Sequence, residues 1–135
     1  MKYSLVCVFF LLGLFSCNNP RVSDNDRFIV GKWRLFKTVV FQNNDDSAGV
    51  ACNACPEITF VKNHAGFIKR PGKILFYFNW EFDGSRLYIK QTDPAAHHTL
   101  NDILNEGTYK VTYSRQFQET ALFDSLKNTK YVLRR

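Results

Sequence analysis

One segment, residues 74–82, restricts the fold more than any other part of this chain. Its large aromatic residues recur at every second position, and they are Phe76, Phe78, Trp80 and Phe82. Because successive side chains of a β-strand point to opposite faces, this spacing predicts a strand with one apolar and one polar face. The turn residues Asp83-Gly84-Ser85 then predict that a second strand, residues 86–91, folds back as a hairpin.

Six further segments have a similar short, alternating or β-branched pattern. They cover residues 28–41, 57–62, 67–69, 109–113, 121–123 and 131–133, with turn residues between most of them. About eight strands in one short chain predict a single all-β domain, either a closed barrel or a sandwich. We expect the barrel, antiparallel and up-and-down.

One short helix is also predicted, over about two turns near residues 99–104. Thr99 is a favourable N-cap residue, and Gly107 suits the position after the last turn. Leu100, Ile103 and Leu104 form one apolar stripe between them. We expect this helix to lie across one end of the barrel.

The first 16 residues differ in composition from everything that follows. Lys2 precedes an uninterrupted apolar stretch over residues 5–15, and the sequence becomes polar directly after Ser16-Cys17. This is the layout of a secretory signal, and the stretch is too short to span a bilayer comfortably as a permanent helix. The sequence therefore predicts an exported protein.

Leu14-Phe15-Ser16-Cys17 resembles the lipobox of bacterial lipoproteins. The resemblance implies that residues 1–16 are removed, that Cys17 carries the lipid, and that residues 17–27 form a flexible tether before a domain over residues 28–135. An ordinary cleaved signal with an incidental cysteine is the alternative. Within the tether, residues 23–26 resemble the acidic sorting signals of Bacteroidetes surface lipoproteins, or they form a solvated linker. The expected location is the cell envelope, at the outer membrane, facing the periplasm or the cell surface.

Gly31-Lys32-Trp33 matches the GxW signature at the start of the first lipocalin strand. With the lipobox, the tether and the aromatic hairpin, the chain resembles the small lipocalin-like lipoproteins of the Bacteroidetes type over residues 28–135. The resemblance implies that Trp33 closes one barrel end beneath a cation of the last strand, here Arg134 or Lys130. A second lipocalin motif is not recognisable, and the chain is shorter than true lipocalins.

An eight-stranded barrel holds either its own side chains or one small ligand. We expect nine rings to face inward: Trp33, Phe60, Phe67, Phe76, Phe78, Trp80, Phe82, Tyr109 and Tyr113. So many rings fit a packed core. They also fit an apolar pocket in which the two tyrosine hydroxyls are the polar contacts. In that case the ligand-binding residues are Trp33, Phe60, Phe76, Phe78, Trp80, Tyr109 and Tyr113.

The pair Cys52 and Cys55 is the second candidate site. In an exported protein two close cysteines predict a disulfide. A thiol redox pair is an alternative, but Pro56 and a strand follow where such proteins place an activating helix. For a metal site the further ligands would have to come from the three histidines of the chain, which are His64, His97 and His98. We expect neither a metal nor a cofactor.

Net charge and sequence motifs bear on whether the chain binds nucleic acid, acts as an enzyme or binds another ligand. The formal charge of +6 becomes +5 without the leader, which holds one basic and no acidic residue. A basic barrel is compatible with nucleic-acid binding, but the export signal argues against it. Nucleophile-elbow, zinc-protease, P-loop and dinucleotide-binding motifs are absent from the sequence, so we expect no enzyme. The expected function is a monomeric, lipid-anchored binding protein for a small apolar ligand. A filled barrel that binds a protein or glycan through its surface is the alternative, followed by a thiol redox module.

Overall fold

The computed structural model describes residues 24–42, 45–46, 49–52, 54–92 and 104–135. The predicted signal peptide, the lipidation site Cys17 and residues 99–103 of the predicted helix lie outside these residues. The helical structure within them is one 3-10 turn, η1 (Asp26–Phe28). In the same residues, no helix is long and apolar enough to cross a bilayer.

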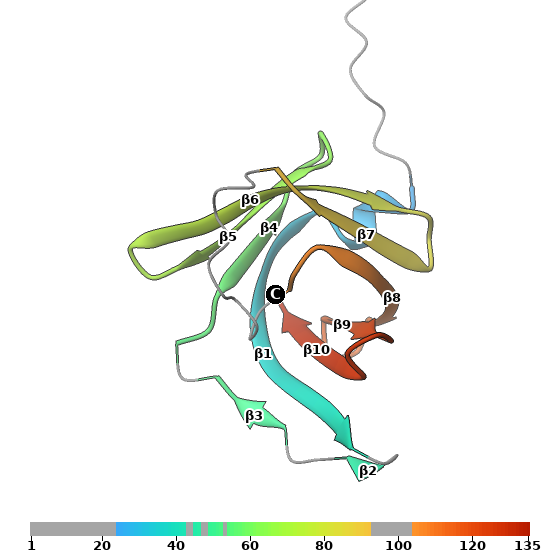
Figure 1. Ribbon diagram of the computed structural model, residues 1–135. Helices are drawn as coiled ribbons and strands as arrows, with labels where there is room; N and C mark the ends of the chain where they lie inside the picture. Colours follow the sequence, from blue (N-terminus) through green and yellow to red (C-terminus); the bar gives the residue numbers. More distant parts are fainter. Residues whose placement is uncertain (1–23, 43–44, 47–48, 53, 93–103) are drawn as a thin grey trace, which may run out of the picture.

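Eight strands form a closed antiparallel barrel. They are β1 (Gly31–Gln42), β4 (Glu57–Phe60), β5 (Ala65–Arg70), β6 (Lys73–Phe82), β7 (Arg86–Gln91), β8 (Gly107–Ser114), β9 (Glu119–Asp124) and β10 (Thr129–Arg134). From β4 to β10 each strand pairs with the next, and β1 pairs with both β4 and β10, which closes the sheet (Figure 1). The predicted up-and-down barrel is therefore confirmed, strand number included.

Strand β1 reaches beyond the barrel and carries two additional short strands. Its register against β10 shifts between Leu35 and Lys37, a bulge that bends the long strand. The two-residue strands β2 (Asp45–Asp46) and β3 (Val50–Ala51) pair with the second half of β1. Both lie outside the ring of the other strands (Figure 1). These two short strands, which lie between β1 and β4 in the sequence, are therefore not part of the closed barrel.

The predicted alternation of β6 is present in the structure. Phe78 and Trp80 are buried, whereas Tyr77, Asn79 and Glu81 are exposed. Leu87 and Ile89 of β7 lie opposite Phe82 and Trp80 and are buried as well. The inward residues of neighbouring strands meet in one cluster, which also includes Trp33, Phe60, Tyr109, Leu122 and Tyr131. Period-two alternation therefore fills the barrel as the sequence indicates.

Phe67 does not face inward, which corrects one prediction. It pairs with Thr59 and Tyr77, and its ring lies 6.2 Å from the ring of exposed Tyr77. The inward positions of β5 are Gly66 and Ile68, both buried. Gly66 has a steric reason to be glycine, because a Cβ atom there would lie 2.4 Å from the Phe78 ring. A small inward residue thus makes room for a large one on the next strand.

Candidate functional site

The start of β1 closes one end of the barrel. The Trp33 indole Nε1 donates a hydrogen bond to the Ile29 carbonyl at 2.7 Å, and both residues are buried. The Arg135 guanidinium lies 4.6 Å from the Trp33 ring and donates to the Val30 carbonyl at 3.1 Å. The chain segment after η1 is therefore fixed to the barrel by side chains from both ends of the domain.

The cation over Trp33 is Arg135, not Arg134 or Lys130 as the resemblance implied. Leu133 points into the core, so alternation along β10 sends Arg134 to the outside. There Arg134 lies 3.4 Å from the centre of the Phe36 ring. Arg135 follows the last residue of β10 and reaches the barrel end, where its guanidinium lies over the Trp33 ring.

Two polar residues hold η1 against the turn between β4 and β5. The Asp26 carboxylate lies 3.3 Å from His64 Nε2, and the His64 ring lies 4.9 Å from the ring of Trp80. Trp80 in turn donates from its indole Nε1 to the Ala65 carbonyl at 2.9 Å. Asp26 is buried although it lies within the predicted tether. The last residues of that segment thus contribute to the closed barrel end.

Five of the predicted ligand-binding residues lie in the packed core: Trp33, Phe60, Phe78, Trp80 and Tyr109. The Phe60 ring makes edge contacts with Phe78 at 5.4 Å and with Trp80 at 5.6 Å. The Tyr109 hydroxyl donates to the Asn105 carbonyl at 2.7 Å and accepts from its N–H at 3.0 Å. Burial raises the pKa of Tyr109 well above its ordinary value. The side chain of Phe76, also predicted to bind the ligand, lies outside the part of the chain that the structure describes.

Tyr113 occupies a different position, on a pocket of about 410 Å³ that we call the barrel-end pocket. Its lining residues are Phe28, Ile29, Phe82, Gly84, Val111, Tyr113, Arg115 and Thr120. The rings of Phe28 and Tyr113 lie 5.6 Å apart, and the two residues are 40% and 37% exposed. The pocket therefore lies between η1 and the inward faces of β6, β8 and β9, at the end of the barrel.

Two polar residues, Thr120 and Arg115, are among those that line this pocket. Thr120 is only 1% exposed, and its hydroxyl oxygen has no hydrogen-bond partner among the residues that the structure describes. A buried hydroxyl without a partner is costly, and this oxygen is itself covered, so a ligand must move the atoms over it to reach it. Arg115 is exposed and supplies a positive charge. Sequence reasoning missed Phe28 and Thr120, because the pocket joins elements that are far apart in the chain.

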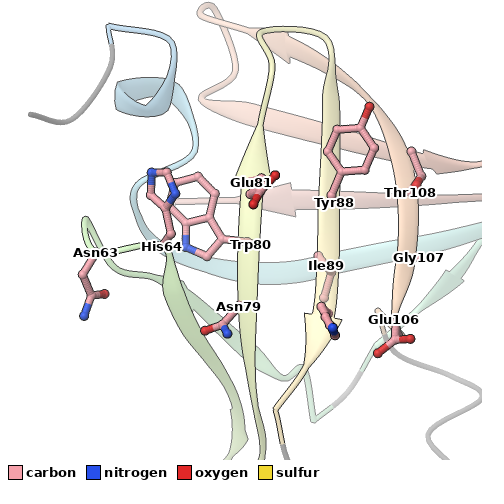
Figure 2. Close-up of a pocket in the computed structure, with 11 residues that line it drawn as sticks. Asn63, His64, Asn79, Trp80, Glu81, Tyr88, Ile89, Glu106, Gly107 and Thr108 are labelled. Atoms are coloured by element: carbon pink, nitrogen blue, oxygen red, sulfur yellow. The ribbon is translucent and has the colours of Figure 1, made fainter. Parts of the chain in front are cut away.

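A second, larger depression of about 670 Å³ lies beside Trp80, and we call it the outer cleft (Figure 2). Its lining residues are Asn63, His64, Asn79, Trp80, Glu81, Tyr88, Ile89, Lys90, Glu106, Gly107 and Thr108. Cross-strand neighbours build its wall, since Tyr88 lies opposite Glu81 on one side and Thr108 on the other. Tyr88 is 38% exposed, so an aromatic ring stands among amide, carboxylate and hydroxyl groups.

The predicted disulfide between Cys52 and Cys55 is absent, and both cysteines are free. The physical reason is the direction of the Cys55 thiol, which donates to the Cys52 carbonyl oxygen at 2.6 Å. Partial burial and this neighbouring cysteine raise the pKa of Cys55 to about 11, against the opposing effect of nearby Arg34. A thiol with such a pKa is largely protonated at neutral pH, which does not favour redox reactivity.

His64 is the one of the three histidines that the structure describes, and it contacts Asp26 rather than the cysteines. In the described part of the chain, no group of three or more His, Cys, Asp or Glu residues is arranged to hold a metal ion. No known protein family, curated protein or solved structure matches this chain.

Proposed function

We propose that this chain is a lipid-anchored, lipocalin-like protein that binds a small apolar ligand in the barrel-end pocket. The observation that carries the proposal is the lining of that pocket, in which apolar side chains accompany Thr120, whose buried hydroxyl has no partner among the described residues. Ligand sites of this kind combine apolar walls with a few polar groups and enclose about 300–1,000 Å³. The barrel-end pocket, at about 410 Å³, falls within this range.

The same lining suggests the chemistry of the ligand. Phe28, Phe82 and Tyr113 offer ring surfaces to an apolar body, while the covered Thr120 hydroxyl offers a hydrogen bond to a ligand that displaces the atoms over it. The Arg115 guanidinium has no ion pair in the described residues and favours an acceptor or an anionic group at the pocket. We therefore propose an amphipathic ligand of the fatty-acid class.

The anchor and the location belong to the same proposal. Cys17 attaches the chain to the outer membrane of a bacterial cell envelope, facing the periplasm or the surface, and the protein acts as a monomer. Support comes from the order of elements: the lipobox and the short polar segment are followed by η1, which forms part of the pocket wall through Phe28. Ligand exchange at this pocket then depends on the segment that continues into the tether.

A diazirine-labelled dodecanoate added to membranes that contain the full chain tests the proposal. After irradiation, we expect the label on peptides that contain Phe28 or Tyr113, and native mass spectrometry should show one retained ligand. The variant Arg115→Gln should bind the probe at least fivefold more weakly. Arg86→Gln, which removes an exposed arginine outside the pocket, is the matched control and should bind normally. Labelling elsewhere, or equal binding by both variants, contradicts the proposed site.

A glycan ligand in the outer cleft is the second candidate function, and exposed Tyr88 favours it. Sugars stack on aromatic faces and bond to planar polar groups, and Tyr88 stands beside Glu81 in a cleft that also contains Asn79 and Glu106. Screening the chain against envelope polysaccharide fragments tests this function. Tyr88→Ala should abolish the binding, whereas Tyr77→Ala, which removes an exposed tyrosine outside the cleft, should leave it unchanged. Equal loss in both variants would exclude the outer cleft as the site.

A further inference from the structure

Positive charge is concentrated along β10, β1, β4 and β5, and Arg135 extends it to the barrel end. Two adjoining depressions of about 480 and 250 Å³ share the residues Arg34, Cys55 and Glu57. We call them together the basic groove. Its cationic residues are Lys32, Arg34, Lys69, Arg70, Arg134 and Arg135.

Two carboxylates compensate only part of this charge. The Glu57 carboxylate lies 3.0 Å from Lys69 Nζ, and Glu119 forms an ion pair with Arg134. The Arg135 guanidinium donates to backbone carbonyls, which carry no net charge. Lys32, Arg34 and Arg70 have no ion pair in the described part of the chain. Four side-chain charges therefore stay uncompensated on one face of a chain whose formal charge is +6.

The strand register places two of these arginines directly against each other. Arg34 of β1 lies opposite Arg134 of β10 on one side and opposite Glu57 of β4 on the other. Glu57 pairs with Lys69 and not with Arg34 in the described residues. Like charges in directly opposite positions of a sheet destabilise it. An anion bound between the two guanidinium groups would turn this repulsion into attraction.

We propose that the basic groove binds a ligand that carries two phosphate groups, one in each depression. Lys32, Arg134 and Arg135 surround the larger depression, Lys69 and Arg70 the smaller one, and Arg34 borders both. A phosphate monoester carries a charge of about −1.5 to −2 at neutral pH and three acceptor oxygens, which suits a set of several cations. The guanidinium fork of arginine binds phosphate through two parallel hydrogen bonds.

This site is independent of the proposed lipocalin-like function. The basic groove and the barrel-end pocket have no lining residue in common, and they differ in the ligand they suit, one polar and anionic, the other largely apolar. Failure of either proposal therefore leaves the other standing. Phosphate groups of this kind occur on lipid headgroups and on soluble phosphorylated molecules, and the two sources have the same chemistry in the groove.

Titration of the full chain in neutral detergent with inorganic pyrophosphate tests the groove. The double variant Arg34→Gln/Arg70→Gln should raise the dissociation constant at least tenfold. The control Lys62→Gln/Lys110→Gln removes the same charge from exposed residues that do not line the groove, and it should change the constant less than twofold. Equal weakening by both double variants would show bulk charge attraction and overturn the proposal, as would the absence of binding to the unaltered chain.

Two further measurements test the role of the Arg34 fork and the source of the phosphate groups. Arg34→Lys keeps the charge but loses the bidentate fork, so it should weaken pyrophosphate binding about threefold to tenfold. Unchanged binding by Arg34→Lys would contradict the role of the fork. If phosphatidylcholine vesicles that contain diphosphoryl lipid A, a lipid with two phosphate monoesters, displace pyrophosphate while pure phosphatidylcholine vesicles do not, a lipid headgroup is the source. No displacement by either vesicle identifies a soluble phosphorylated ligand, and both results support the phosphate site.

Discussion

The barrel core and the barrel-end pocket are built from the same kinds of inward-facing residue, yet they differ in what the polar atoms contact. In the core, the Trp33 and Trp80 indoles and the Tyr109 hydroxyl each have a backbone partner within 3.0 Å. In the barrel-end pocket, the buried Thr120 hydroxyl has no partner among the described residues, and the Phe28 and Tyr113 rings are partly exposed.

The difference shows which property separates a structural aromatic cluster from a binding surface. Residue type and strand alternation are alike in both regions, because each strand sends every second side chain inward. Satisfied hydrogen bonds and full burial leave the core nothing to offer a ligand. The pocket has open ring surface and an unused hydroxyl. Matched substitutions in the two regions should therefore affect stability and binding in opposite ways.

The largest expected effect is the loss of a core ring. Trp33→Ala removes a fully buried indole and should lower the free energy of unfolding by about 3–5 kcal/mol. Phe28→Ala, in the pocket wall, should cost less than half as much, because the side chain is already 40% exposed. Urea denaturation followed by circular dichroism measures both values. Similar losses for the two variants would mean that Phe28 belongs to the core and not to a binding surface.

A smaller effect is expected from the two tyrosine hydroxyls. Tyr109→Phe leaves the N–H and carbonyl of Asn105 without their partner and should destabilise the protein by about 1–3 kcal/mol. Tyr113→Phe should be within about 0.5 kcal/mol of the unaltered protein, as is usual for surface changes. Thermal unfolding of the two variants under the same conditions checks the contrast. A loss at Tyr113 as large as that at Tyr109 would remove the distinction between the regions.

The same hydroxyl predicts how stability depends on pH. Burial raises the pKa of Tyr109 in the folded chain, whereas the unfolded chain has the ordinary value of about 10. Above pH 10 the unfolded state releases a proton that the folded state keeps, so the free energy of unfolding should fall with rising pH. Urea midpoints between pH 9 and 11 measure this fall. It should be smaller in Tyr109→Phe, and an unchanged slope would contradict the assignment to Tyr109.

The barrel is predictable from the sequence because its signal is local. The alternation in residues 74–82 and the turn at Asp83-Gly84-Ser85 together define β6, β7 and their inner faces. The Asp83 carboxylate accepts hydrogen bonds from the N–H groups of Ser85 and Arg86, which also holds the pKa of Asp83 below its ordinary value. The turn residues and the strand alternation thus predict the same hairpin, and each signal lies within ten consecutive residues.

The barrel-end pocket is not predictable in this way, because it depends on contacts between distant segments. Phe28 and Tyr113 are 85 positions apart in the sequence, and their ring contact forms only when η1 lies over the end of β8. Arg135 reaches Trp33 for a similar reason, since the end of β10 determines which cation arrives at the barrel end. The sequence predicts the wrong face for Phe67 because small Gly66 carries no hydrophobic signal, although Gly66 occupies the inward position.

The smallest expected effect compares two buried threonines, one in each environment. The Thr129 hydroxyl donates to the Lys127 carbonyl at 2.9 Å, so Thr129→Val should destabilise the protein by about 1 kcal/mol. Thr120→Val replaces a hydroxyl that has no partner among the described residues by a methyl group, and it should be neutral or stabilising by up to about 1 kcal/mol. The same Thr120→Val variant should bind dodecanoate more weakly, if that hydroxyl serves the ligand. Calorimetric unfolding and a parallel measurement of dodecanoate binding show whether the Thr120 hydroxyl serves the ligand or the fold. If Thr120→Val loses stability but not binding, the hydroxyl serves the fold.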